Sequence, residues 1–139
     1  MRGVLNGLVA ETSRTAIVDL EAGLEHLSRG TARHVDTLFI VGEPYFKSLE
    51  TASRSFALAK DLGIKQVRMV ANKVRTPRDE DTVRDFAGRH GLLVEAVVPF
   101  DDAVVAADER GAALIEYQPA APSVTAIRRL ADGVLNTAR

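Results

Sequence analysis

An acid and a glycine follow the first strongly apolar run of the chain. Ala16-Ile17-Val18 ends at Asp19, and Glu21 and Gly23 follow within four residues. Such a run is typical of a buried parallel strand, and ligands bind parallel sheets at the carboxyl ends of their strands. An aspartate there can hold Mg²⁺ through water, as in nucleotide hydrolases, while an aspartate that only caps a turn explains the same pattern. Likewise, Gly23 either provides a turn or lets its N–H approach a terminal phosphate.

Three later apolar runs also end in polar or turn-forming residues, and each is followed by a helical pattern. Since the carboxyl ends of parallel strands meet at one edge of the sheet, we expect all of these clusters to lie near one another. The proline of Glu43-Pro44 bars further strand pairing, so that pair is most simply a strand terminator. The predicted strands and the clusters after them are Thr37–Val41 with Glu43-Pro44, Gln66–Ala71 with Asn72-Lys73, and Val94–Val98 with Pro99-Phe100-Asp101-Asp102.

Asn72-Lys73 resembles the start of a base-recognition motif. Guanine readers need a carboxylate two residues after the lysine, and Arg75 stands there with no acceptor to offer. If a base is bound, adenine is therefore favoured, with the Asn72 amide donating to and accepting from its edge. An asparagine that only satisfies loop backbone remains the alternative.

Helical patterns alternate with the strands, which predicts an α/β fold with a three-layer parallel sheet and helices on both faces. We expect residues 1–139 to form a single domain. Thr76, Pro77 and Asp79 form an N-terminal capping pattern. In the last helix we expect a core-facing stripe of Val124, Ile127, Leu130, Ala131, Val134 and Leu135. The remaining predicted strand is Thr15–Leu20. The predicted helices are Met1–Glu11, Leu24–Ser28, Lys47–Leu62, Thr76 to about Arg89, about ten residues ending at Arg110, and a helix after Gln118–Pro122.

Composition limits the classes of function. The chain has no cysteine, 18 Lys and Arg, and 19 Asp and Glu without a long run of one sign, so we expect a cytoplasmic protein without a nucleic-acid partner. No apolar run approaches the roughly 20 residues that span a bilayer. The last helix has only Arg128 and Arg129 as paired bases, which argues against membrane binding. None of His26, His34 and His90 has helical pair spacing, so we expect no intrinsic metal site.

Three stretches resemble one family of proteins. They are DLEAGLEHLSRGT at 19–31, VANKV at 70–74 and VPFDDAVVAADERGAALIEYQPAAPSVTAIRRLAD at 98–132. The first looks like the switch region of the CooC-type branch of the MinD/ParA P-loop ATPases, which insert nickel into carbon monoxide dehydrogenase. The other two are similar to the carboxyl half of that family, so the resemblance covers essentially the whole chain.

The resemblance implies roles for individual residues. Asp19 would be the Walker B-like acid near Mg²⁺, and Glu21, Ala22 and Gly23 would belong to the switch that senses the γ-phosphate. Asn72 would hydrogen-bond adenine, and Lys73 would support the base-binding loop. In the family, ATP closes two protomers into a homodimer and hydrolysis reopens them, which couples ATP or ADP to metal delivery or partner binding. The segment that would flank the adenine is Pro99, Phe100 and Asp101.

The sequence also departs from the family. It contains no Gly-rich phosphate loop with a Lys-Ser/Thr ending, and no Cys-x-Cys metal site. The resemblance therefore implies the carboxyl-terminal half of such an ATPase, a partial P-loop NTPase fold lacking the P-loop strand.

Two functions remain open on these grounds. The first is an ATP-dependent maturation or positioning ATPase with a metalloenzyme client. The second is a non-catalytic nucleotide-binding or dimerisation module. A weaker third is an amidotransferase-type ligase of the cobyrinic-acid group, which would need a further glutaminase domain.

Overall fold

A computed structural model describes residues 15–20 and 34–137, and it contains a three-stranded parallel sheet with the strand order β1-β2-β3. The strands are β1 Thr37–Gly42, β2 Gln66–Val74 and β3 Val94–Pro99. The helices are α3 Phe46–Asp61, α4 Pro77–Arg89, α5 Asp102–Asp108, α6 Leu114–Tyr117 and α7 Pro122–Thr137.

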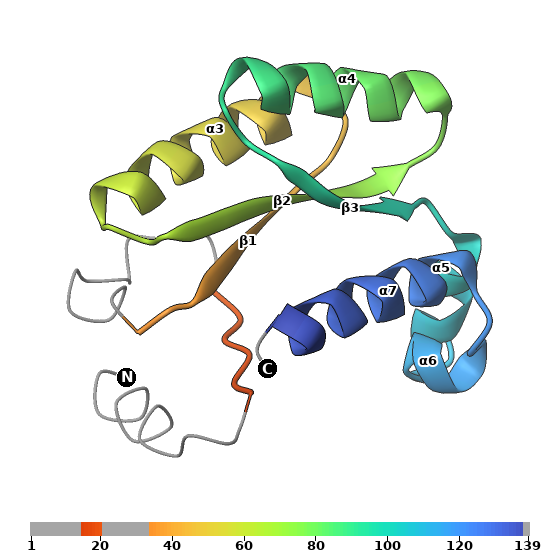
Figure 1. The fold of residues 1–139 in the computed structure, drawn as a ribbon. Coiled ribbons are helices and arrows are strands. Elements are labelled where there is room, and N and C mark those ends of the chain that lie inside the picture. The colour runs from red at the N-terminus through yellow and green to blue at the C-terminus, as the bar shows by residue number, and fades with distance from the viewer. Residues whose placement is uncertain (1–14, 21–33, 138–139) are drawn as a thin grey trace.

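Helices cover both faces of this sheet (Figure 1). α3 packs on β1 and α4 on β2 from one side, while α7 packs on β3 from the other. The short helices α5 and α6 lie beyond the carboxyl ends of the strands. The predicted three-layer α/β architecture is therefore confirmed. Within residues 34–137, no helix has the length and apolarity needed to cross a bilayer.

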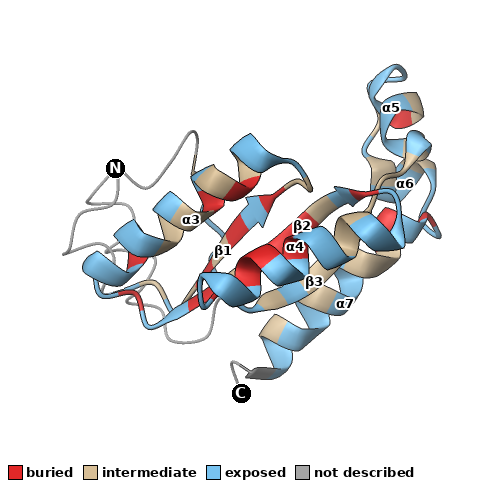
Figure 2. Cartoon of the chain, turned by 90° about the horizontal axis from the view of Figure 1, so that it is seen from above, coloured by how far each residue is buried: buried red, intermediate tan, exposed pale blue. Residues whose placement is uncertain are grey.

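The core lies between the sheet and the pair α3 and α4 (Figure 2). Alternate residues of each strand point to this face, as the two-residue period of a strand requires. Met69 of β2 is fully buried there beside Leu38 and Ile40 of β1. Gly42 ends β1 against this core, where an added Cβ atom would lie 2.7 Å from Cε of Met69 and would have to displace the end of that side chain.

The predicted start of α4 and the predicted end of α3 are confirmed. The Thr76 side chain accepts a hydrogen bond from Asp79 N–H, and the Asp79 carboxylate accepts from Thr76 N–H, so the two residues form a capping box after which Pro77 begins α4. The hydrogen bond from Arg75 N–H is the main reason why the pKa of Asp79 is lowered. Beyond α3, Gly63 has a φ of 82°, which glycine adopts without strain.

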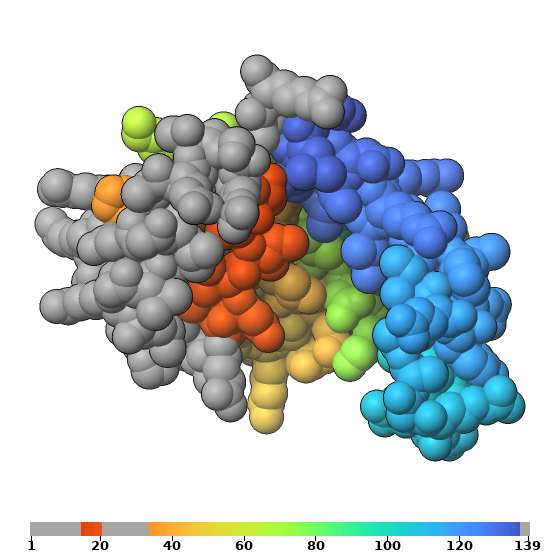
Figure 3. Space-filling model, turned by 90° about the horizontal axis from the view of Figure 1, so that it is seen from below, coloured from red at the N-terminus to blue at the C-terminus, as the bar shows by residue number. Residues whose placement is uncertain are grey.

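The predicted strand Thr15–Leu20 is wrong. These residues form no strand, and Ile17 and Val18 are 92% and 43% exposed. A parallel strand needs a hydrogen-bonded neighbour, and residues 15–20 pair with none of β1, β2 and β3, so they lack the ladder that would make them a strand. Leu20 alone packs against the core. Figure 3 shows residues 15–20 and α7 on either side of a hollow beneath the sheet.

The prediction for the last helix is correct in part. Val124 is buried and Leu130 and Val134 are half-buried, whereas Ile127 and Leu135 are about half exposed. Only the side of α7 that packs on β3 is covered, because α7 does not extend over β1 and β2. The sequence did not predict α6, which has only four residues. The predicted helices Met1–Glu11 and Leu24–Ser28 lie outside the described residues.

Met69→Ala tests the position of the core. The side chain is fully buried, so its truncation should lower the free energy of unfolding by about 2–5 kcal/mol. Urea denaturation would measure this change. Leu93→Ala is the matched control, because Leu93 is 62% exposed and should cost well under half as much. Equal losses in the two variants would contradict the assigned core.

Candidate functional site

The carboxyl end of β2 extends further than predicted. The strand continues through Asn72 and Lys73 to Val74, and its register against β3 shifts between Ala71 and Val74. Lys73 is the one non-glycine residue of the described chain with positive φ, at 55°. An extra residue in a strand commonly produces such a bulge and re-aims the side chains around it. Asn72, which is half-buried, therefore lies in a distorted strand end rather than in a loop.

An ion pair joins the ends of β1 and β2. Lys73 Nζ lies 2.9 Å from Glu43 Oε1. Glu43 also accepts a hydrogen bond from Tyr45 N–H at its carbonyl and donates its own N–H to Ser48 Oγ, both at 2.8 Å. Sequence reasoning missed this pairing, although opposite charges at the ends of neighbouring strands are its signal. Because Lys73 is more than half exposed, the pair contributes little to stability and mainly fixes the edge.

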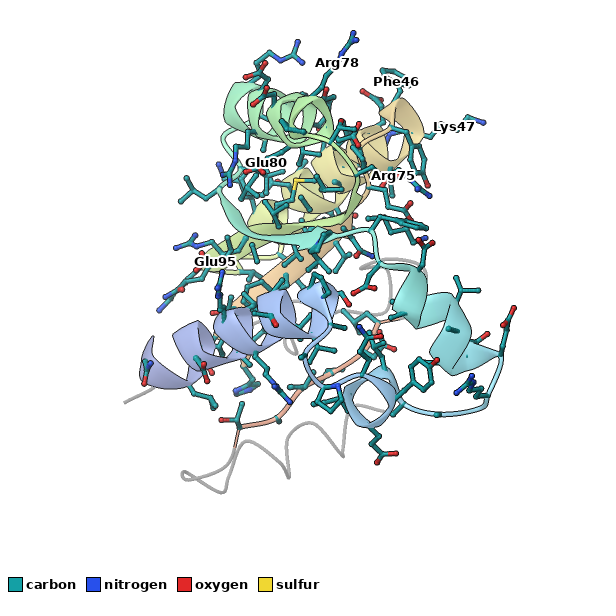
Figure 4. All side chains as sticks on the ribbon, turned by 90° about the vertical axis from the view of Figure 1, so that its right-hand side faces the viewer. Phe46, Lys47, Arg75, Arg78, Glu80 and Glu95 are labelled. Atoms are coloured by element: carbon teal, nitrogen blue, oxygen red, sulfur yellow. The ribbon has the colours of Figure 1, made fainter. Side chains whose placement is uncertain are left out.

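Phe100 is stacked against Arg75 at the same edge. The guanidinium carbon of Arg75 lies 3.4 Å from the centroid of the Phe100 ring, and Phe100 N–H donates to the carbonyl of Val74 at 2.8 Å. A cation over an aromatic face is attracted by the ring quadrupole. Figure 4 looks onto this end of the molecule and shows Arg75 on the same side as Phe46 and Lys47 of α3. The contact between Arg75 and Phe100 was not predicted.

The carboxylate of Asp101 holds the starts of two helices. Its Oδ1 accepts from Ala103 N–H at 3.0 Å as the N-cap of α5, and its Oδ2 accepts from Ser123 N–H at 3.1 Å and Ser123 Oγ at 2.8 Å in the first turn of α7. Ser123 is only 3% exposed. The hydrogen bonds from Ser123, above all the one from its hydroxyl, lower the pKa of Asp101. They also show that this carboxylate has a structural task next to Phe100.

The structure therefore brings most of the predicted base-binding residues to one edge. Asn72 and Lys73 end β2, while Pro99, Phe100 and Asp101 follow in the neighbouring strand β3 and the turn after it. All of them except Lys73 are half-buried.

The predicted phosphate-side residues are not placed in the same way. Asp19 is exposed on the irregular segment 15–20, and Glu21 and Gly23 lie outside the described residues. Two shallow hollows of the described residues lie away from the edge. One lies between β3 and α7, and the other lies around Lys60 and Gly91 at the amino ends of the strands.

The described residues contain no group of three metal-ligating side chains. His34 is exposed, and His90 Nδ1 forms a hydrogen bond of 2.8 Å with the carbonyl of Phe86 while its ring stacks on that side chain. His26 lies outside the described residues.

Sequence comparison finds relatives that are about twice as long as the region matched. Carbon monoxide dehydrogenase accessory protein CooC of Rhodospirillum rubrum is 40% identical over 120 residues, which are 86% of this chain and 45% of that protein. The uncharacterized ATP-binding protein MJ0823 of Methanocaldococcus jannaschii is 40% identical over 112 residues, which are 80% of this chain and 43% of that protein. The chain thus spans about half the length of the curated relatives it matches. No protein-family model matches it.

Solved structures share the fold. The MinD cell division protein of Aquifex aeolicus superimposes with a TM-score of 0.66 at 18% identity, over 82% of this chain and 50% of MinD. The chain shares the fold of the MinD/ParA-like P-loop ATPases. The MinD of Pyrococcus horikoshii, solved in complex with Mg-ADP, has a TM-score of 0.63 at 17% identity over 94% of this chain and 55% of that one. In sequence, the chain is similar to CooC over most of its own length.

The positive φ of Lys73 can be tested in this MinD/ParA-like chain with two substitutions. Lys73→Gly and Lys73→Met both remove the ion pair with Glu43, but only glycine adopts a φ of 55° without strain. We expect Lys73→Gly to unfold with a free energy about 0.5–1 kcal/mol higher than Lys73→Met. Urea denaturation of the two variants side by side measures the difference. A glycine variant less stable than the methionine variant would argue against the bulge.

The Asp101 carboxylate predicts a pH dependence of stability. Because its pKa is lowered in the folded chain, its contribution is fully present above the unfolded value of about 3.9 and is lost as pH falls through the folded pKa. Asp101→Asn should be less stable than wild type at pH 7, since its amide group opposes the Ser123 donors. That difference should shrink as the pH falls below about 4 in urea titrations. Asp132→Asn, on the exposed side of α7, is the control that should show no such deficit.

Proposed function

We propose that this chain supplies the adenine-binding part of a CooC-type ATPase that serves in metal-centre assembly or partner positioning. One observation carries the proposal. The residues predicted for base recognition on two separate strands meet at one edge of a MinD/ParA-like sheet, in a chain 40% identical to a carbon monoxide dehydrogenase accessory protein. Ligands of such sheets bind at this edge, which supports a nucleotide site there.

The edge offers suitable groups for a purine. The Asn72 amide provides both a donor and an acceptor for the base edge, and Pro99 provides apolar surface beside it, while Phe100 is covered on one face by Arg75. Lys73 supports the strand end through its ion pair with Glu43. Asp101 flanks the base indirectly, because its carboxylate is already engaged by the starts of α5 and α7. The chain thereby supplies a preformed surface rather than an enclosed pocket.

The phosphate side of the site follows from the resemblance to MinD/ParA-like proteins. Asp19 would hold Mg²⁺ through water, and Glu21 and Gly23 would respond to the γ-phosphate. Bound Mg²⁺ would neutralise charge developing on the phosphates. Mg-ADP in the Pyrococcus horikoshii MinD supports this choice of cofactor. A metalloenzyme client belongs to the same proposal, because CooC is a carbon monoxide dehydrogenase accessory protein. Closure of a homodimer on ATP and nickel as the cargo are added from the family resemblance of the sequence.

A second candidate function is a non-catalytic module that binds nucleotide or dimerises without hydrolysis. The sequence favours it in one respect, since none of its 139 residues form a Gly-rich phosphate loop ending in Lys-Ser/Thr. The phosphate released from Mg-ATP by the purified chain distinguishes the two. Hydrolysis abolished by Asp19→Asn supports the ATPase, and binding without hydrolysis supports the module.

Calorimetric titration tests nucleotide binding directly. We expect Mg-ADP to bind the 139-residue chain saturably, and Asn72→Ala to weaken binding about tenfold through loss of its hydrogen bonds to the base. Mg-GDP should bind less well than Mg-ADP. Asn136→Ala, on the exposed end of α7, is the matched control and should bind like wild type. Absence of saturable heat, or equal weakening by both substitutions, would reject the proposed adenine site.

A further inference from the structure

Arg75 stands where a guanine reader would have a carboxylate, and the structure gives it a task of its own. We propose that the Arg75 guanidinium, held 3.4 Å from the centroid of the Phe100 ring, is the surface on which the purine base stacks. The bound base would thus form the outer layer of a stack in which Arg75 is the middle layer and Phe100 the inner one. This inference rests on the proposed nucleotide site and adds to it the residue that contacts the face of the base.

The stack between Arg75 and Phe100 is unusually close. Its distance of 3.4 Å from guanidinium carbon to ring centroid places the two groups in contact, with the cation over the ring centre. The other cations over rings are farther away, with Lys60 at 5.2 Å from Phe56 and Arg110 at 4.9 Å from Tyr117. Those two contacts are typical of long surface side chains, whereas the Arg75 contact fixes a planar group in one place.

The outer side of Arg75 is open to a ligand. The residue is exposed, and the structure records no ion pair for its guanidinium within the described residues, while the neighbouring Lys73 is paired with Glu43. The Arg75 backbone N–H donates to Asp79, which fixes the main chain at the start of α4. A guanidinium plane is weakly hydrated, and nucleobases stack on such planes in nucleic-acid complexes. A base can therefore cover the outer face of Arg75 without breaking an ion pair among the described residues, although the Asp79 carboxylate interacts electrostatically with Arg75.

Arg75 and Phe100, which together form the proposed base platform, are held together independently of any ligand. Phe100 N–H donates to the carbonyl of Val74, whose side chain is buried, so the residue before Arg75 and the ring beneath it are fixed to each other. Preorganisation of this kind reduces the entropy lost when a ligand binds.

Recognition of the base is divided between two residues, with Arg75 at its face and Asn72 at its edge. Asn72 lies three positions before Arg75 on the same strand end and has both a donor and an acceptor for a base edge. A guanidinium stacked on the face of a base cannot distinguish adenine from guanine, since every base has such a face. Arg75 should therefore set the affinity for purines in general, and Asn72 should set the preference among them.

The test compares Arg75→Lys and Arg75→Gln with Mg-ADP and magnesium pyrophosphate as probes in calorimetry of the whole chain. Stacking requires the planar group, so both substitutions should weaken ADP binding about fivefold or more. Pyrophosphate, which has no base, should bind the variants and wild type alike. The preference for ADP over GDP should remain unchanged. Arg78→Gln, at an exposed position of α4, is the control with an equal loss of charge.

Four results would overturn the inference. Wild-type affinity for ADP in Arg75→Lys would show that Arg75 acts as a point charge, and a parallel loss of pyrophosphate binding would assign it to the phosphates. Unchanged affinity in Arg75→Gln, with saturable binding by wild type, would remove Arg75 from the site and leave the proposed function intact. Wild-type protein that binds no ADP would remove both. The stack itself is checked separately by the upfield NMR shift of the Arg75 Nε–H, which Phe100→Leu should abolish.

Discussion

The packing of α7 against the sheet depends on the hydrogen bonds of the Asp101 carboxylate. This carboxylate caps α5 on one side and accepts from the buried Ser123 at the start of α7 on the other. α7 is the helix that covers the second face of the sheet, so one side chain at the end of β3 ties the third layer to the second. The residue before it is Phe100. The position of the proposed base platform and the position of α7 are therefore set by the same two-residue connection between β3 and α5.

Much of this fold could be predicted from the sequence, because local signals and the tertiary fold agree. Thr76 and Asp79 cap the start of the helix that was predicted there, and the alternation of apolar runs with helical patterns correctly predicted the parallel sheet. The strand Thr15–Leu20 could not be judged in this way. Its apolar run is a genuine strand pattern, but a strand forms only where a neighbour completes its hydrogen bonds, and that depends on the rest of the sheet.

The site was predictable to the level of its strands and not to the level of its contacts. Asn72, Lys73 and Phe100 were expected at one edge and lie there. Their partners were not expected, because the pairing of Lys73 with Glu43 links residues 30 positions apart and the pairing of Asp101 with Ser123 links residues 22 apart. The stack of Arg75 on Phe100 begins directly after the register shift that lies between Ala71 and Val74 of β2. Sequence periodicity contains no information on such a bulge.

The edge of β1 has a consequence for the behaviour of the chain in solution. Within the described residues no strand lies beside this edge, so alternate N–H and C=O groups of Thr37–Gly42 face outward next to the exposed side chain of Val41. An unprotected edge of this kind is a template for pairing with another strand. At high protein concentration the open edges of two copies can pair with each other, and the fraction of monomer then depends on the protein concentration. Whatever covers the open edge of β1 therefore affects the tendency of the chain to associate as well as its folding.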